Sequence, residues 1–172
     1  AVLEKDSINN FINIAEKIDD FAIIGPAIQD EFSKKDLNFD KNQFFEVDSL
    51  KGFAMFLNIE QFRDIGFFDS NFFIYLEEID LCKRFKNKNK KIYLDKNIVV
   101  NHLGGSSHNS SIDFEMELSR NWHWMWSTFY FHKKHYGFLN SLSKVFFKLL
   151  SSLIKTIFFT VSLNNKKRKI YY

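Results

Sequence analysis

Residues 21–24 form a short unbroken apolar run, Phe-Ala-Ile-Ile, and Gly25 and Pro26 follow it directly. The residues before it, 2–18, space their apolar side chains three and four apart, as one face of an α-helix does. The run itself is typical of a buried strand, and a Gly-Pro pair is a common strand stop. A helix followed by a buried strand is half of an α/β unit, so this succession predicts an α/β fold.

Further segments extend this alternation of helices and strands. We expect strands at residues 44–47, 52–57, 92–94 and 98–100, and helices at 59–65, from residue 77, and at 112–135. The basic run 86–91 suits the C-terminus of the helix that begins at Glu77, and Gly66 and Gly137 end the other two. Residues 29–42 are polar and predict a surface excursion.

The composition limits the class of protein. The chain has 172 residues, 45% of them hydrophobic, which is enough to bury the core of one domain. Its one cysteine, Cys82, excludes an internal disulfide framework and a cysteine-based zinc cluster. A net charge of +3 does not indicate binding to DNA or RNA, so we expect no nucleic-acid partner.

Residues 138–163 are apolar but contain Lys144, Lys148 and Lys155, which lie on one helical face. Three charges argue against a bilayer-spanning helix. An amphipathic helix on a membrane or on a partner fits the pattern, and the basic residues 166–169 would favour an anionic leaflet. The alternative is a core-packing helix with a solvated lysine face and a frayed basic tail, and the pattern leaves both open.

Three carboxylates occupy four positions at Glu77, Glu78 and Asp80. On a helix, Glu77 and Asp80 share a face, whereas Glu78 points elsewhere. Acidic residues in a first helical turn commonly do no more than complement the helix dipole. The alternative is a general base at the mouth of a pocket, and the residues alone do not decide between the two.

Two further positions carry chemically useful side chains. His102 follows a predicted strand and precedes a Gly-Gly-Ser-Ser loop, where it could bind a metal, donate to a phosphate or cap the loop. Trp122 and Trp126 lie one helical turn apart and could stack on a sugar ring or pack against another helix.

Taken in order, five segments resemble the C-terminal half of inverting family 2 glycosyltransferases with a GT-A fold, especially rhamnosyltransferase-like enzymes of bacterial surface polysaccharide synthesis. The segments are Ile24-Gly25-Pro26, Gly52-Phe53-Ala54-Met55, Ile65-Gly66-Phe67-Phe68-Asp69, residues 72–84 (Phe-Phe-Ile-Tyr-Leu-Glu-Glu-Ile-Asp-Leu-Cys-Lys-Arg) and residues 102–107 (His-Leu-Gly-Gly-Ser-Ser). The match covers most of residues 1–135, and its most specific part is residues 65–84.

The resemblance implies an α/β fold that is the C-terminal part of a GT-A domain, followed by helices. Residues 1–111 would be the acceptor half of the catalytic domain, without the donor-binding N-terminal half. Residues 112–172 would be a helical region with an amphipathic, membrane-associated helix and a basic tail. Because Ala1-Val2-Leu3 resembles the segment directly after the family's donor motif, we expect a fragment that is inactive alone.

The reaction implied is transfer of a sugar, with inversion, from a nucleoside diphosphate sugar to a glycan or lipid-linked acceptor. Glu78 stands where the family has its catalytic Asp and would deprotonate the acceptor hydroxyl, with Glu77 as its acidic neighbour. Asp80 and Arg84 would orient the helix or the acceptor. Gly52 would let the backbone approach the donor sugar.

The remaining roles also follow from the resemblance. Phe72, Phe73 and Tyr75 would line the acceptor side, with Trp122, and His102 would complete a site for Mg²⁺ or Mn²⁺. The protein would be cytoplasmic and peripheral at the inner face of the cell membrane. An alternative function is a catalytically incomplete fragment that serves only as a binding or assembly module at the membrane surface.

Overall fold

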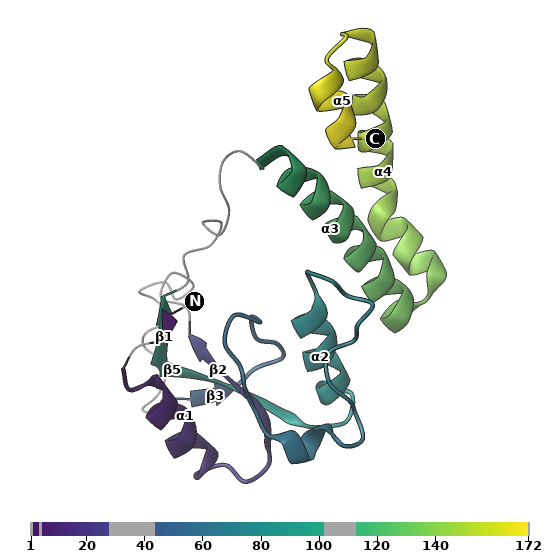
Figure 1. Ribbon diagram of the computed structural model, residues 1–172. Coiled ribbons are helices and arrows are strands. Elements are labelled where there is room, and N and C mark those ends of the chain that lie inside the picture. The colour runs from purple at the N-terminus through teal and green to yellow at the C-terminus, as the bar shows by residue number, and fades with distance from the viewer. Residues whose placement is uncertain (1, 4, 28–43, 102–112, 172) are drawn as a thin grey trace. The chain divides into compact units, whose positions relative to one another are not determined.

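The chain forms two compact units in a computed structural model that describes residues 2–3, 5–27, 44–101 and 113–171 (Figure 1). The sheet unit comprises Ala1–Asp69 and Glu77–Gly104, and the helical unit comprises Ser70–Leu76 and Gly105–Tyr172. Residues 70–76 therefore group with the helices, although the sequence placed them in the first domain. The expected boundary at residue 111 lies outside the described residues.

The sheet unit confirms the mixed α/β class. Its strands are β1 (Val2–Leu3), β2 (Phe21–Ala27), β3 (Phe44–Glu46), β4 (Phe56–Leu57) and β5 (Lys91–Asn101), in the order β1-β5-β2-β4, with β3 also on β5. The pair β2–β5 is parallel and the other pairs are antiparallel. All seven residues of β2 are buried, so this strand is the centre of the unit.

Two apolar clusters pack on β2. One joins Phe11 and Ile14 of α1 (Ser7–Ala15) to Ile24. The other joins Leu81 and Phe85 of α2 (Glu77–Lys86) to β2, and also contains Phe62 from the 3-10 helix Ile59–Phe62. The sheet is thus covered by α1 on one side and α2 on the other (Figure 1). This layering places the start of α2 beside the core.

The expectation that Gly25 and Pro26 stop the first strand is wrong, because β2 continues to Ala27. The short strand β4 pairs only with Ile23 and Ile24, so a proline beyond that point removes no bond to β4. Gly25 is required by packing, since a Cβ there would lie 2.6 Å from Cδ2 of the buried Leu50.

Two other strand predictions need correction. Residues 52–55 form a turn rather than a strand, and Gly52 in this turn lies against the side chain of Glu78 on α2. The segments 92–94 and 98–100 belong to one strand, β5, with a bulge where the pairing jumps from Asp95 to Val99. The buried Asp95 accepts hydrogen bonds from the backbone and side-chain nitrogens of Asn97, at 2.7 and 3.1 Å.

The predicted helices are confirmed with shifted bounds. α1 begins at Ser7 rather than near residue 2, because Val2 and Leu3 pair with β5. The helix predicted for 59–65 is a 3-10 helix that ends at Phe62, and Gly66 lies beyond it with a positive φ of 78°. That backbone conformation favours glycine.

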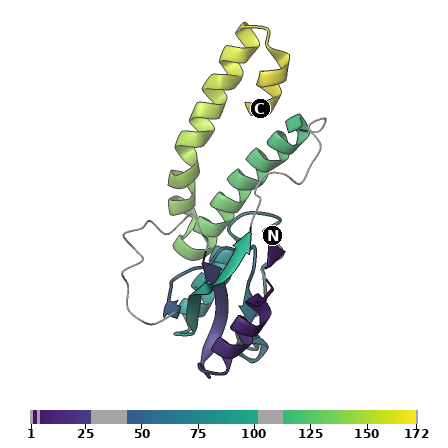
Figure 2. The same cartoon turned by 90° about the vertical axis from the view of Figure 1, so that its left-hand side faces the viewer.

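The helical unit contains α3 (Asp113–Tyr136), α4 (Phe138–Val161) and α5 (Asn165–Tyr171). Gly137 separates α3 from α4 with φ 89°, as the sequence predicted. The basic tail is helical rather than frayed: α5 returns along α4, where Tyr171 stacks on Phe159 at 5.8 Å (Figure 2). None of the helices within the described part of the chain has the length and hydropathy that crossing a bilayer requires.

Candidate functional site

The acidic start of α2 carries the candidate general base. α2 begins at Glu77, directly after Tyr75 and Leu76, whose φ angles are 71° and 66°. Two consecutive non-glycine residues in this left-handed region cost about 1–3 kcal/mol each. The backbone therefore turns sharply into the helix and brings Glu77 and Glu78 into its first turn.

Glu78 packs directly against Gly52. A Cβ at position 52 would lie 3.3 Å from the Cβ of Glu78, which is tighter than most such contacts, and 3.6 Å from its Cγ, which is ordinary van der Waals contact. Any side chain at this position would press on the Glu78 side chain. The structure thus brings together two of the predicted site residues that are 26 positions apart in the sequence.

The surroundings of Glu78 alter its acidity. Burial raises the pKa of the Glu78 carboxyl, and the neighbouring negative charge of Glu77 raises it further. A backbone hydrogen bond and the charge of Lys51 act in the opposite direction. The net result is a pKa above the ordinary 4.5, which makes the carboxylate a stronger base than an exposed glutamate.

Glu77 has an unusual polar atom. Its Oε2 is buried and has no hydrogen-bond partner in the part of the chain that the structure describes. Buried polar atoms are almost always hydrogen-bonded, so an unpartnered carboxylate oxygen beside the candidate base is a feature that needs a cause. A polar group from a substrate or from further protein would satisfy it.

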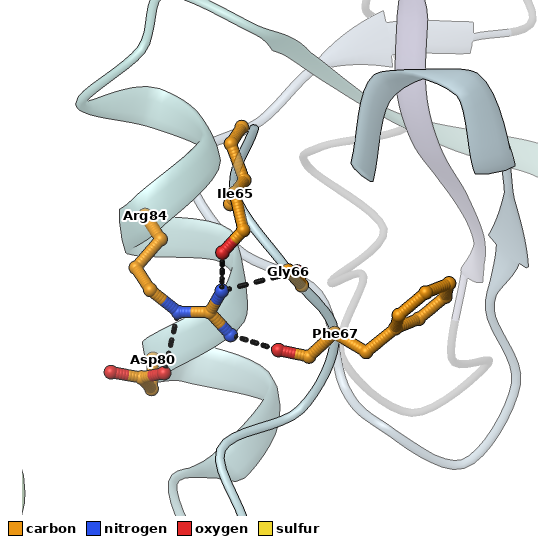
Figure 3. Close-up of polar contacts among 5 residues, drawn as sticks. All are labelled: Ile65, Gly66, Phe67, Asp80 and Arg84. Carbon is orange, nitrogen blue, oxygen red and sulfur yellow. Dashed lines mark hydrogen bonds and ion pairs between the residues drawn. The ribbon is translucent and has the colours of Figure 1, made fainter. Parts of the chain in front are cut away.

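Asp80 and Arg84 form a clamp rather than an open site (Figure 3). The Asp80 side chain is 0% exposed and accepts a hydrogen bond from Nε of Arg84 at 2.8 Å. The guanidinium also donates to the carbonyls of Ile65, Gly66 and Phe67. These contacts hold residues 65–67 against α2, and the expected role in orienting the helix or an acceptor stays a prediction.

The predicted acceptor-side aromatics belong to the helical unit. Phe72 is buried and meets Tyr130 edge to face at 4.9 Å, and its side chain therefore serves packing. Phe73 is 78% exposed and stacks on His123 at 4.6 Å. Tyr75 lies 5.3 Å from Trp124.

The sequence missed the residues that hold this aromatic segment. Nε1 of Trp126 donates to the carbonyl of Asn71 at 3.0 Å, and Oγ of Ser127 donates to the carbonyl of Ile74 at 2.7 Å. Ser127 is completely buried. A serine among apolar neighbours on a helix was the one available signal, and periodicity alone does not name its partner.

Trp122 has a different setting from the one expected. It is exposed, stacks on Trp126 at 6.2 Å, and lines a groove of about 590 Å³ with residues of all three helices. Leu149 of α4 and Tyr171 of α5 also line this groove. The two tryptophan rings thus stack on each other, and the expected contact of Trp122 with an acceptor sugar stays a prediction.

A divalent cation finds no complete set of ligands among the described residues. No group of three His, Cys, Asp or Glu side chains there could hold a metal ion. The predicted ligand His102 and the rest of the loop 102–107 lie outside the described residues. The described part of the chain therefore does not by itself fit Mg²⁺ or Mn²⁺.

Comparison with protein-family models, with curated proteins and with solved structures found no match. The half-buried carboxylate of Glu78, which packs against Gly52, is the feature that most clearly indicates a possible chemical role.

Proposed function

We propose that this chain is the acceptor half of an inverting GT-A glycosyltransferase of bacterial surface polysaccharide synthesis. Its substrates would be a nucleoside diphosphate sugar and a hydroxyl group of a glycan or lipid-linked acceptor. The observation that carries the proposal is Glu78, a half-buried carboxylate with a raised pKa that packs on the turn at Gly52. The order of motifs around it is the order of the family it resembles.

In the proposed reaction, Glu78 accepts the proton of the acceptor hydroxyl. The oxygen then forms a bond to the anomeric carbon of the donor sugar, while the bond from that carbon to the diphosphate breaks. The diphosphate leaves with the electron pair, and attack from the opposite face inverts the configuration. General base catalysis of this kind contributes about 10²–10⁴-fold in rate.

Other residues of the sheet unit would position Glu78. Gly52 keeps the space beside the carboxylate free of a side chain. Arg84 and Asp80 hold residues 65–67 on α2 and so stabilise the helix that carries the base. The unpartnered Oε2 of Glu77 is available to a hydroxyl of the acceptor.

Two parts of the proposed enzyme are not among the described residues. The donor would be bound by an N-terminal half outside residues 1–172. Mg²⁺ or Mn²⁺, with His102 as one ligand, would stabilise the leaving diphosphate when bound. Because the described residues do not complete a site for it, no step above uses the cation. We place the enzyme in the cytoplasm, peripheral to the inner face of the membrane, where a lipid-linked acceptor would be reached.

The test is the variant Glu78→Gln in the protein expressed from its complete open reading frame. Transfer from a panel of radiolabelled nucleoside diphosphate sugars to membrane extract should fall about 100-fold or more, with unchanged circular dichroism. Glu78→Asp should keep measurable transfer, since it keeps a carboxylate. The matched control is Glu60→Gln, which removes an exposed acid from the 3-10 helix and should leave the rate unchanged.

Wild-type turnover in Glu78→Gln would remove Glu78 from the mechanism. A second candidate function is a binding or assembly module without catalysis, and the exposed apolar side chains of α4 favour it. Absence of transfer by the wild-type full-length protein with every donor, together with retained membrane binding, would select that second function.

A further inference from the structure

The apolar side chains of α4 are largely uncovered. Phe147 is 75% exposed and Val161 is 80% exposed, and only Ser141 and Val145 of this 24-residue helix are buried. The other exposed apolar side chains are Phe138, Leu139, Leu142, Phe146, Leu149, Leu150, Leu153, Ile154, Ile157 and Phe158. An apolar surface of this extent on one helix marks an interaction site rather than ordinary surface.

These side chains form one face of α4. Leu139, Phe146, Leu150, Leu153 and Ile157 follow one another at intervals of seven, four, three and four, which is helical spacing on a single side. The buried contacts of α4 lie on a different side, through Ser141 and Val145. The core-packing interpretation of this helix therefore does not describe its apolar face.

The charge of the same region has a single sign. Residues 138–172 contain seven Lys and Arg residues and no Asp or Glu. The aromatic rings of the α4–α5 pair hold part of this charge in place. Nζ of Lys155 lies 4.5 Å from the ring of Tyr171, and Nζ of Lys167 lies 5.6 Å from the ring of Phe159. The basic α5 is thus fixed along the side of α4 that carries Lys155 and Phe159, whereas the apolar face lies on the other side of α4.

The exposed apolar face and the positive charge of this region together indicate what binds to α4. A second copy of the chain would bring a region with seven further positive charges and no Asp or Glu, and regions of like net charge oppose association. A bilayer surface with anionic headgroups offers the opposite charge together with an apolar layer just beneath it. A basic amphipathic helix without the length and hydropathy to span the bilayer lies in the plane of such a surface.

We infer that α4 and α5 dock on an anionic lipid bilayer, with the exposed apolar face of α4 in the headgroup–acyl boundary and the basic residues of the polar side of α4 and of α5 attracted to the anionic headgroups. This inference concerns the helical unit alone and does not depend on sugar transfer. It names the lipid chemistry and the surface that recognises it.

The experiment is co-sedimentation of the 172-residue chain with vesicles. One set contains phosphatidylglycerol and phosphatidylcholine in equal parts, and the other contains phosphatidylcholine alone. The chain should pellet with the anionic vesicles, and high salt should weaken the binding. Replacing Lys167, Arg168 and Lys169 together by Gln should reduce the affinity about 100-fold, because each charge near the surface contributes about fivefold.

A matched pair of variants tests the apolar face. Leu153→Glu places a charge in the centre of the face, and Ser151→Glu places the same charge two residues away on another side of α4. Both positions are exposed, so both proteins should keep their helical circular dichroism. Binding should be lost in Leu153→Glu and retained in Ser151→Glu. Leu153→Ala, with a smaller loss, serves if the glutamate variant unfolds.

Three results would overturn the inference. The first is a wild-type chain that does not pellet with anionic vesicles. The second is equal binding of Leu153→Glu and Ser151→Glu. The third is a stable dimer in sedimentation equilibrium that Leu153→Glu dissociates, since the face would then be an interface between copies. None of these results bears on the Glu78→Gln transfer assay, so the two proposals fail separately.

Discussion

Replacing Arg84 by Ala should destabilise the sheet unit strongly. The guanidinium joins the fully buried Asp80 to the carbonyls of residues 65–67, and its loss removes the ion pair between Arg84 and the buried Asp80 carboxylate. Breaking a buried ion pair by removing one partner costs about 3–5 kcal/mol. The Arg84 side chain retains 17% exposure, which favours the lower end, about 3 kcal/mol.

The size of the effect makes it easy to measure. In a unit of roughly 100 residues, 1 kcal/mol shifts Tm by about 4–8 °C, so Arg84→Ala should lower Tm by more than about 10 °C. Arg84→Lys keeps the charge but lacks the planar fork, and should lose about 1–2 kcal/mol. Lys88→Ala removes an exposed cation just after α2 and should stay within about 0.5 kcal/mol of wild type.

The assay must report on the sheet unit alone. All three tryptophans, Trp122, Trp124 and Trp126, belong to the helical unit, so their fluorescence follows that unit. Hydrogen exchange measured on peptides covering residues 59–69 and 77–94 follows the clamp directly. Protection there should fall in Arg84→Ala. A loss below about 1 kcal/mol, or an Arg84→Lys protein as stable as wild type, would refute the reasoning from the clamp.

Three further outcomes are expected of the sheet unit. Glu78→Gln should raise stability at neutral pH, because burial raises the pKa of the carboxyl and its ionisation therefore opposes folding. The gain should shrink as the pH falls through the raised pKa toward the ordinary 4.5 and be lost below it, and a constant difference across a pH series of urea titrations would contradict it. Gly25→Ala should cost about 1–3 kcal/mol in urea unfolding, since the new Cβ meets Leu50, and Leu50→Ala in the same chain should recover part of the loss. Cys82 should resist alkylation in the folded protein at mildly alkaline pH, because burial raises the pKa of its thiol to about 11; labelling as fast as in urea would show that the thiol is accessible.

Local pattern was sufficient for the elements that depend on neighbours in the chain. The buried run at residues 21–24, the acidic helix start at Glu77 and the break at Gly137 all appear where they were predicted. Each reflects a property of one segment, such as apolar spacing or the conformational freedom of glycine. The mixed α/β class follows from the same local signals.

Contacts between residues that are far apart in the sequence could not be predicted from local pattern. Gly52 reaches Glu78 across a turn that the sequence presented as a strand. Arg84 binds carbonyls 17 to 19 residues away, and backbone carbonyls carry no sequence signature. The aromatic segment 70–76 groups with α3, through Trp126 and Ser127, and not with the sheet that precedes it.

The spacing of residues 138–161 was enough to predict which face of this helix is apolar and that its lysines lie on another side. The packing of the three helices was needed to learn that α3 and α5 leave most of that face uncovered, and that the basic tail is a helix packed on α4. Periodicity shows only which side of a helix avoids water. The group that covers that side depends on the packing of the other helices.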